Sequence, residues 1–155
     1  MNAAQVGIGF AQRRVPEREA PRQRANNFIE RERHGLPPLL AFAHEIVMGG
    51  RTLKRPVNYA LLRIAPPSGV NVDARRRPHL IVDPRGGHGP GIGGFKEDSE
   101  LGVALGTGHP VYFVVFFRDP APGLTLLEGY KAERKFVRCV RALHPDAPKP
   151  ALYLL

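Results

Sequence analysis

The stretch of sequence that decides the fold runs from Pro78 to Phe117 and has four pieces: PHLIVD, PRGGHGPGIGGF, KEDSELGVAL and GTGHPVYFVVFF. The first and last pieces contain short apolar runs bounded by Gly and Pro, which is typical of buried strands. The third piece places Leu101, Ala104 and Leu105 at helical spacing. A strand, a loop, a helix over 96–105 and a second strand predict a parallel β-α-β unit.

Two further strands are expected before this unit. The segments Leu39–Val47 and Val57–Ile64 have strand character, and they are separated by Met48-Gly49-Gly50-Arg51, which is a turn signal. Only antiparallel neighbours can be joined by so short a connection. We therefore expect an antiparallel strand pair at the start of the sheet.

One helix and one strand are expected after the unit. Thr125–Leu143 has the apolar spacing of a long helix, and the run 151–155 begins another buried strand. Val111–Phe117 is apolar at every position, which indicates burial on both faces and a central parallel strand. The expected fold class is therefore α/β: an antiparallel strand pair followed by a β-α-β-α-β parallel sheet, with helices on both faces.

The charge of the chain bears on its partners. A formal net charge of +9 and a pI of 10.4 suggest acidic partners, such as nucleic acid or an anionic membrane surface. However, the charge is spread along the chain, and the arginines of the segment from Arg13 to Arg33 alternate with glutamates, as on a solvated helix face. The other dense cluster is Arg75-Arg76-Arg77. A nucleic-acid-binding module remains an alternative, and a solvated surface is favoured.

The domain organisation and the compartment follow from simple counts. Residues 1–35 are expected to form a basic amino-terminal segment with a helix from about Pro21 to His34, and residues 36–155 a single domain. No run approaches the roughly 18 apolar residues of a membrane span. Because the single Cys139 cannot form an internal disulfide, a reducing compartment is indicated, and a cytoplasmic location is expected.

The glycine-rich loop allows three interpretations. As a phosphate-binding loop, Gly89-x-Gly91-x-x-Gly94 satisfies G-x-G-x-x-G, but six residues separate it from the strand, and Pro90 has no N–H to offer. As an oxyanion loop, it follows the third strand, where α/β-hydrolases place one backbone donor. As a surface loop it has no chemistry. The oxyanion interpretation is favoured, with these candidate residues: Gly86, Gly87, His88, Gly89, Gly91, Gly93 and Gly94.

The same stretch also resembles a known family. LIVDPRGGHGPGIGGFKEDSELGVAL, GHPVYFVVFF and HPDAPKP, together with NNFIERERHGLPPLL and RPVNYALLRI upstream, are similar to a bacterial family of uncharacterised α/β-hydrolase-like proteins related to polyhydroxyalkanoate synthases. The resemblance covers about residues 24 to 152. It implies the N-terminal part of an α/β-hydrolase fold, with ester hydrolysis or acyl transfer on hydroxyacyl substrates in a full-length parent, and no cofactor.

One departure from that family changes the expectation. In the family, the strand after the Lys-Pro dipeptide leads to a nucleophile elbow, whereas here Lys149-Pro150-Ala151-Leu152 is followed by only three residues. The chain contains no G-x-S-x-G or G-x-C-x-G, so no catalytic nucleophile, acid or base can be assigned. We therefore expect a truncated, inactive domain that self-associates through the unpaired edge of its last strand.

Other chemistry-bearing residues give weaker signals. His88 is expected to orient the loop by hydrogen bonding, and Cys139, inside the expected helix, to pack rather than react. Asp83 and Asp98 are interpreted as loop and helix-start residues. The remaining histidines show no metal-ligand spacing, so no metal site is expected: His34, His44, His79, His109 and His144.

Overall fold

The computed structural model describes residues 40–83, 98–117 and 119–154. The chain divides into two compact units, 1–38 and 39–155, and every described residue belongs to the second. The helix expected from Pro21 to His34 lies outside the described residues, and so does the glycine loop, which falls between residues 83 and 98.

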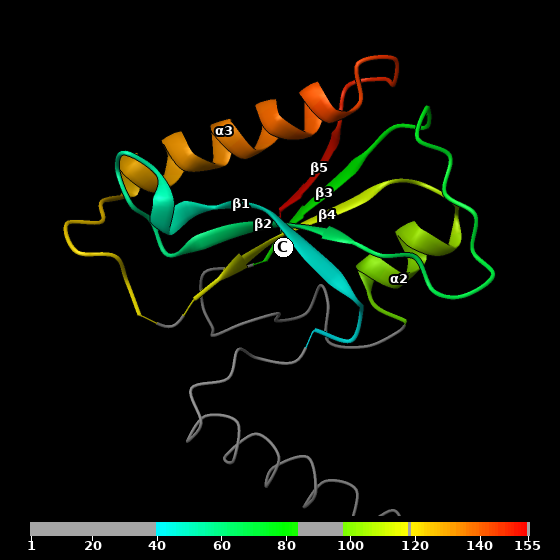
Figure 1. Cartoon of the computed structure of the whole chain (residues 1–155), viewed down its shortest axis with the longest axis horizontal. Helices are drawn as coiled ribbons and strands as arrows, with labels where there is room; N and C mark the ends of the chain where they lie inside the picture. Colours follow the sequence, from blue (N-terminus) through cyan, green and yellow to red (C-terminus); the bar gives the residue numbers. More distant parts are fainter. Residues whose placement is uncertain (1–39, 84–97, 118, 155) are drawn as a thin grey trace, which may run out of the picture. The chain divides into compact units, whose positions relative to one another are not determined.

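A mixed five-stranded sheet is the centre of the second unit (Figure 1). Its strands are β1 (His44–Gly49), β2 (Tyr59–Ile64), β3 (His79–Val82), β4 (Val111–Phe116) and β5 (Ala151–Leu154). They lie in the order β1-β2-β4-β3-β5. Strand β2 is antiparallel to both β1 and β4, while β3 is parallel to both β4 and β5. With its two α-helices, this sheet confirms the broad α/β class.

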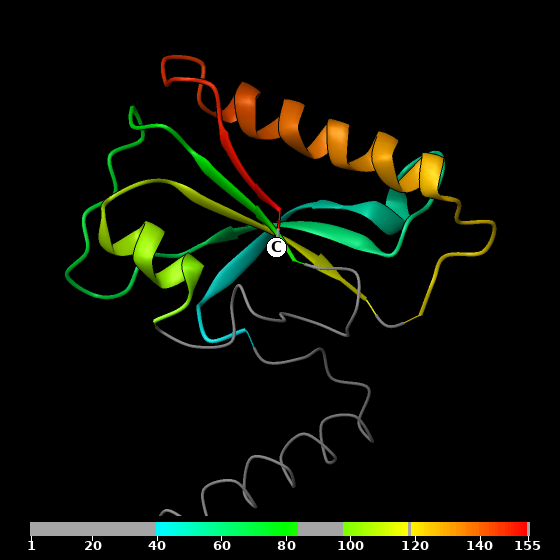
Figure 2. The same cartoon turned by 180° about the vertical axis from the view of Figure 1, so that it is seen from behind.

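The two helices cover opposite faces of the sheet (Figures 1 and 2). Helix α2 (Glu100–Gly106) connects β3 to β4, and helix α3 (Leu126–Leu143) connects β4 to β5. Because successive strand residues point to opposite faces, each helix packs on a separate half of the core. The α2 half includes Leu101, Leu105, Ile81 and Phe113, and the α3 half includes Phe136, Val140, Leu80 and Tyr112.

Both helix starts are visible in the sequence, and one was placed too early. Thr125 is the N-cap of α3, where its side chain accepts a hydrogen bond from the N–H of Glu128, as N-cap threonines do. Helix α2 was expected from residue 96 with Asp98 in its first turn. Instead, Ser99 has extended φ and ψ angles and is the N-cap, so Asp98 lies before the helix and Glu100 occupies the first turn.

The β1–β2 connection also differs from the expected tight turn. Strand β1 starts at His44 rather than at residue 39, and the chain continues from it into a short 3-10 helix, η1 (Gly50–Thr52). Gly50 is buried there, and a Cβ at this position would lie 2.3 Å from the carbonyl oxygen of Tyr59. The glycine is therefore needed for close backbone packing rather than for a two-residue turn.

Strands β4 and β5, which lie on either side of β3, differ in burial. Strand β4 is buried at every residue, as its apolar sequence indicates, although only one of its two neighbours is parallel. Strand β5 was expected to be buried and is not: Leu152, Tyr153 and Leu154 are 51%, 41% and 77% exposed. Among the described residues, β5 pairs with β3 alone, so nothing covers its other edge.

Candidate functional site

The carboxyl ends of the three parallel strands meet at one edge of the sheet. Val82 of β3 is in register with Val114 of β4 on one side and with Leu154 of β5 on the other. The chain leaves β3 towards β4 and then crosses back to β5, so the strand order reverses next to β3. In open α/β sheets, ligands bind in the crevice outside the carboxyl ends at such a reversal.

The expected oxyanion loop begins at this edge. Its candidate residues, Gly86 to Gly94 with His88, lie outside the described residues, whereas both flanks are described. Asp83 is 3% exposed, and its N–H donates to the carbonyl oxygen of Val114 at 3.5 Å. At the other flank, Ser99 is 8% exposed and precedes α2. The loop therefore starts and ends on well-packed residues at the carboxyl edge of β3.

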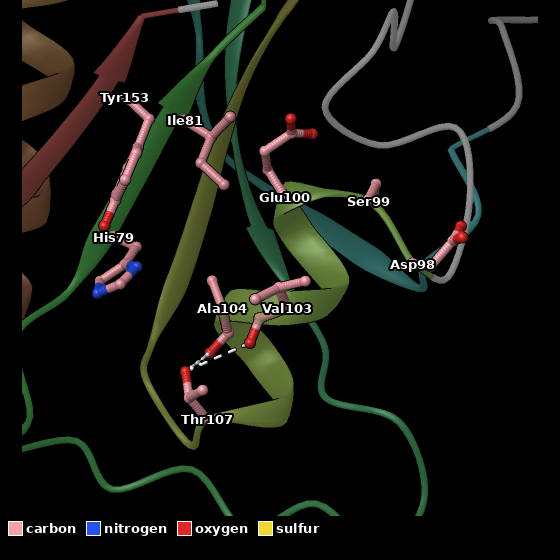
Figure 3. Close-up of a pocket in the computed structure, with 9 residues that line it drawn as sticks. All are labelled: His79, Ile81, Asp98, Ser99, Glu100, Val103, Ala104, Thr107 and Tyr153. Carbon is pink, nitrogen blue, oxygen red and sulfur yellow. Dashed lines mark hydrogen bonds between the residues drawn. The ribbon is translucent and has the colours of Figure 1, made fainter.

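A pocket of about 440 Å³ lies between α2 and the strands β3 and β5 (Figure 3). Its residues are His79, Ile81, Asp98, Ser99, Glu100, Val103, Ala104, Thr107 and Tyr153. Figure 3 shows the Ser99 side chain beyond the amino end of α2 and His79 across the helix from it. Among the described residues, the Ser99 hydroxyl has no hydrogen-bond partner. The pocket therefore contains a serine, a histidine and carboxylates without assembling a nucleophile–base pair.

Cys139 is placed in α3 as expected, half-buried against the core under that helix. Burial raises the pKa of its thiol above the usual range, which keeps the sulfur protonated at neutral pH. Since the thiolate is the nucleophile, this environment favours packing over reactivity.

Most described histidines bond to the backbone rather than to one another. His44 Nδ1 lies 3.0 Å from the carbonyl oxygen of Phe42. His144 connects α3 to the sheet: its Nε2 lies 2.8 Å from the Tyr112 hydroxyl, and its Nδ1 lies 3.0 Å from the carbonyl oxygen of Ala74. Burial raises the pKa of Tyr112. No group of three or more potential metal ligands occurs in the described ranges.

One pair of histidines was missed in the sequence. The rings of His79 and His109, thirty residues apart, lie with their centroids 4.3 Å from each other. The order of the strands could have indicated this pair, because His79 is the first residue of β3 and His109 lies two residues before β4. Because the amino ends of parallel neighbours meet at the same edge, residues at the two starts come together. Spacing along the chain cannot reveal such a pair.

Comparison with known proteins places these observations in context. An "Uncharacterized protein in ackA 5'region" of Rhizobium meliloti is 47% identical over 136 residues, which are 88% of this chain and 19% of the relative. The chain thus spans about a fifth of the length of the curated relative it matches. No solved structure matches it. No helix in the described ranges is long and apolar enough to cross a membrane.

The expected relation to polyhydroxyalkanoate synthases is wrong. The relative is uncharacterised, and the family profile that matches residues 10–153 is described as "Protein of unknown function (DUF3141)". Neither match connects the chain to those synthases, and neither requires it to be a truncated copy. Since the profile covers nearly all of the sequence, the chain belongs to the DUF3141 family.

Proposed function

We propose that this domain is the first part of an α/β-hydrolase-type sheet, and that it serves ester hydrolysis or acyl transfer by supplying one arm of an oxyanion hole. The order β1-β2-β4-β3-β5, with β2 as the one strand that runs against the others, supports this proposal most strongly. This is the arrangement that the hydrolase hypothesis expects from the sequence, an antiparallel strand pair followed by a parallel β-α-β-α-β unit. Fold alone does not determine function, so the proposal also needs support from the residues that would carry the chemistry.

The position of the glycine loop is the second support. In α/β-hydrolases, the loop between the third strand and the following helix donates one backbone N–H to the oxyanion. Here the glycine-rich residues 86–94 connect β3 to α2. Glycines let the backbone turn its N–H groups inward without a Cβ clash. Donors held in place before the reaction are the ones that stabilise a developing oxyanion.

The position of β5 is the third support. The second oxyanion donor of an α/β-hydrolase is the residue after the nucleophile, on a sharp turn between a strand and a helix at the top of the sheet. Leu154 of β5 is in register with Val82 of β3, so the ends of these strands are adjacent. A nucleophile turn after β5 would therefore lie beside the carboxyl end of β3, which the glycine-rich sequence follows. The sequence of residues 1–155 contains neither G-x-S-x-G nor G-x-C-x-G, so we infer that the nucleophile belongs to the additional sequence of longer family proteins such as the matched relative.

The test is performed on a full-length family protein, with substitutions at the positions aligned with Gly86, Gly87, Gly89, Gly91, Gly93 and Gly94. Each glycine is replaced by proline, which removes the N–H, and separately by alanine, which retains it. At the donor position, proline should lower kcat on a p-nitrophenyl ester about 10²- to 10³-fold, while KM changes little. Alanine should preserve most of the activity.

The 155-residue chain is the matched control, because it contains the loop without a nucleophile motif. It should show no turnover above buffer on the same ester or on an acyl thioester. Turnover by this chain comparable to that of the full-length protein would contradict the proposal. Equal kcat values for the proline and alanine variants at every position would contradict the role of the loop.

A further inference from the structure

A cluster of basic side chains lies at the amino edge of the parallel strands, opposite the carboxyl edge at which β3 ends. It consists of His79, His109, Arg76 and Arg77, and we call it the amino-edge cluster. His79 begins β3, and the two arginines belong to the loop that enters this strand. The ring of Tyr153 on β5 lies 5.2 Å from that of His79, centroid to centroid. Three segments distant in sequence therefore meet here.

Hydrogen bonds determine which atoms of the cluster are available. His109 Nδ1 lies 2.8 Å from the carbonyl oxygen of Arg77. A carbonyl oxygen can only accept, so Nδ1 must donate, and Nε2 remains available as the second ring nitrogen. Arg76 donates to the carbonyl oxygen of Thr107 at the end of α2. This bond anchors the β2–β3 loop beside the helix while the other guanidinium nitrogen atoms remain available.

The surroundings of His79 disfavour protonation of its imidazole ring. Its pKa is lowered first by burial and then by the positive charges of His109, Arg77 and Arg76. Among the described residues, no carboxylate is among the charges that shift the pKa of His79. Asp73 belongs to the same loop as the two arginines, where its carboxylate accepts the backbone N–H of Arg75 and its own N–H donates to the carbonyl oxygen of Gly108. Asp98 and Glu100 line the pocket at the amino end of α2. Helix α2 is seven residues long, so these last two lie about 10 Å from its carboxyl end.

This combination excludes one class of ligand and favours another. A metal cation would face two arginines, and within the described ranges no third potential metal ligand joins the two histidines. An anion is attracted to the cluster, because its negative charge offsets the repulsion among the four basic side chains. Guanidinium groups bind oxyanions through paired N–H donors, and a protonated imidazole adds charge-assisted donors.

We propose that the amino-edge cluster binds a small, multiply charged oxyanion of the phosphate and sulfate class. Arg77 and Arg76 provide the permanent charge, and the two imidazoles add charge and donors when the anion draws protons onto them. The site lies at the amino edge of the parallel strands, whereas the proposed acyl chemistry belongs to their carboxyl edge, so the two proposals are independent.

The first experiment titrates the 155-residue chain with sulfate at low ionic strength and follows the imidazole signals by NMR. Sulfate keeps its charge between pH 5.5 and 8, so any pH dependence belongs to the protein. We expect sulfate to raise the apparent pKa of His79, and its affinity to be about tenfold higher at pH 5.5 than at pH 8. Sodium chloride at matched ionic strength should leave the signals in place.

Substitutions locate the site. Arg77→Gln keeps the carbonyl oxygen that holds His109 and removes one charge, so it should weaken sulfate binding at pH 5.5 at least about fivefold. Arg138→Gln on the exposed side of α3 removes the same charge elsewhere and should change the affinity less than about twofold. His109→Asn is a second variant within the cluster, and it should flatten the pH dependence.

Two phosphate probes identify the source of the ligand. Inorganic phosphate alone and phenyl phosphate are compared at one pH, because the apolar pocket residues Ile81 and Ala104 adjoin His79. Tighter binding of phenyl phosphate supports a phosphomonoester, and equal binding supports free phosphate. The proposal is overturned if neither anion shifts the His79 signals more than chloride does. It is equally overturned if Arg77→Gln binds sulfate as tightly as Arg138→Gln.

Discussion

Strands β4 and β5 belong to the same sheet and have similarly apolar sequences, yet they end in opposite environments. Strand β4 has a neighbour on each side and a helix on each face of the sheet around it, and all six of its residues are buried. Strand β5 has β3 on one side, and three of its four residues are exposed. Residue composition alone would have assigned both to the interior.

The difference shows that burial is a property of neighbours. Tyr153 is in register with Ile81 and shares its face, the α2 side, while Leu152 and Leu154 share the α3 side with Leu80 and Val82. Both faces of β5 are therefore apolar, as on a central strand. Its sequence is suited to a position that the described residues do not surround.

The largest effect should come from emptying the centre of the sheet. Phe113 of β4 is fully buried on the α2 side, so Phe113→Ala should lower the free energy of unfolding by about 3–5 kcal/mol through lost burial and a cavity. Leu154→Ala on β5 should cost less than about 1 kcal/mol, because its side chain is mostly in water. Urea denaturation monitored by circular dichroism measures both.

The two variants together test the contrast between the strands. Equal losses of stability would mean that β5 is as well packed in solution as β4, which would contradict the difference in burial between the two strands. A Phe113→Leu variant, which retains most of the volume, should fall between the wild-type chain and Phe113→Ala.

A smaller effect is expected on self-association. Within the described ranges β5 has a neighbouring strand on one edge only, and this edge with its exposed apolar side chains favours pairing with a second copy, as unprotected edges do. Leu154→Lys places a charge on that edge and should raise the monomer fraction at least about fivefold, as edge lysines do in natural sheets. Sedimentation velocity over a range of protein concentrations measures the change.

The matched control for the edge is Leu126→Lys, since Leu126 is 79% exposed, much like Leu154, but lies in the first turn of α3 and does not line the pocket beside β5. It should leave the association unchanged. A wild-type chain that remains a monomer at every concentration would refute the expectation that β5 drives association.

The smallest effect should be on the pH dependence of stability, through His79 on β3, the strand between β4 and β5. Burial, with the charges of His109, Arg77 and Arg76, lowers the pKa of His79 on β3 below 6.5. Its neutral form therefore stabilises the fold fully above about pH 6.5, and this contribution is lost as the pH falls through the folded-state pKa. Between pH 7.5 and 5, the wild-type chain should lose about 1–2 °C more in Tm than His79→Gln does.

That measurement is made in chloride, because sulfate or phosphate would offset the effect if the amino-edge cluster binds them. Identical pH slopes for the wild-type chain and His79→Gln would show that His79 does not contribute. His109→Gln should give an intermediate slope, since it removes one of the charges that act on His79.

Much of the fold was predictable because its signals are local. Thr125 as a helix cap, the apolar runs of β3 and β4, and the helical spacing of Leu101 and Leu105 each involve only a few neighbouring residues. Helix α2 starts later than the expected residue 96 because an acidic residue such as Asp98 suits a first helical turn by sequence, whereas the extended backbone of Ser99 places the first turn at Glu100.

The candidate sites divide in the same way. The glycine loop could be predicted because its residues are contiguous in sequence and follow the residues of β3, and as a site it stays a prediction. The meeting of His79 with His109 was missed, since it depends on two strands starting at the same edge. The expected relation to polyhydroxyalkanoate synthases was wrong for a different reason. Similar blocks of sequence indicated a functional relation that the family match does not support.

The sequence by itself therefore determined the elements, their order and the class of the fold, because helix periodicity, strand composition, caps and glycines act over a few residues. Only the tertiary structure decided the strand order, the exposure of β5 and the grouping of His79, His109 and the arginines at one edge. These features arise from contacts between segments far apart in the chain. Such contacts depend on which strands become neighbours, and no local pattern specifies that choice.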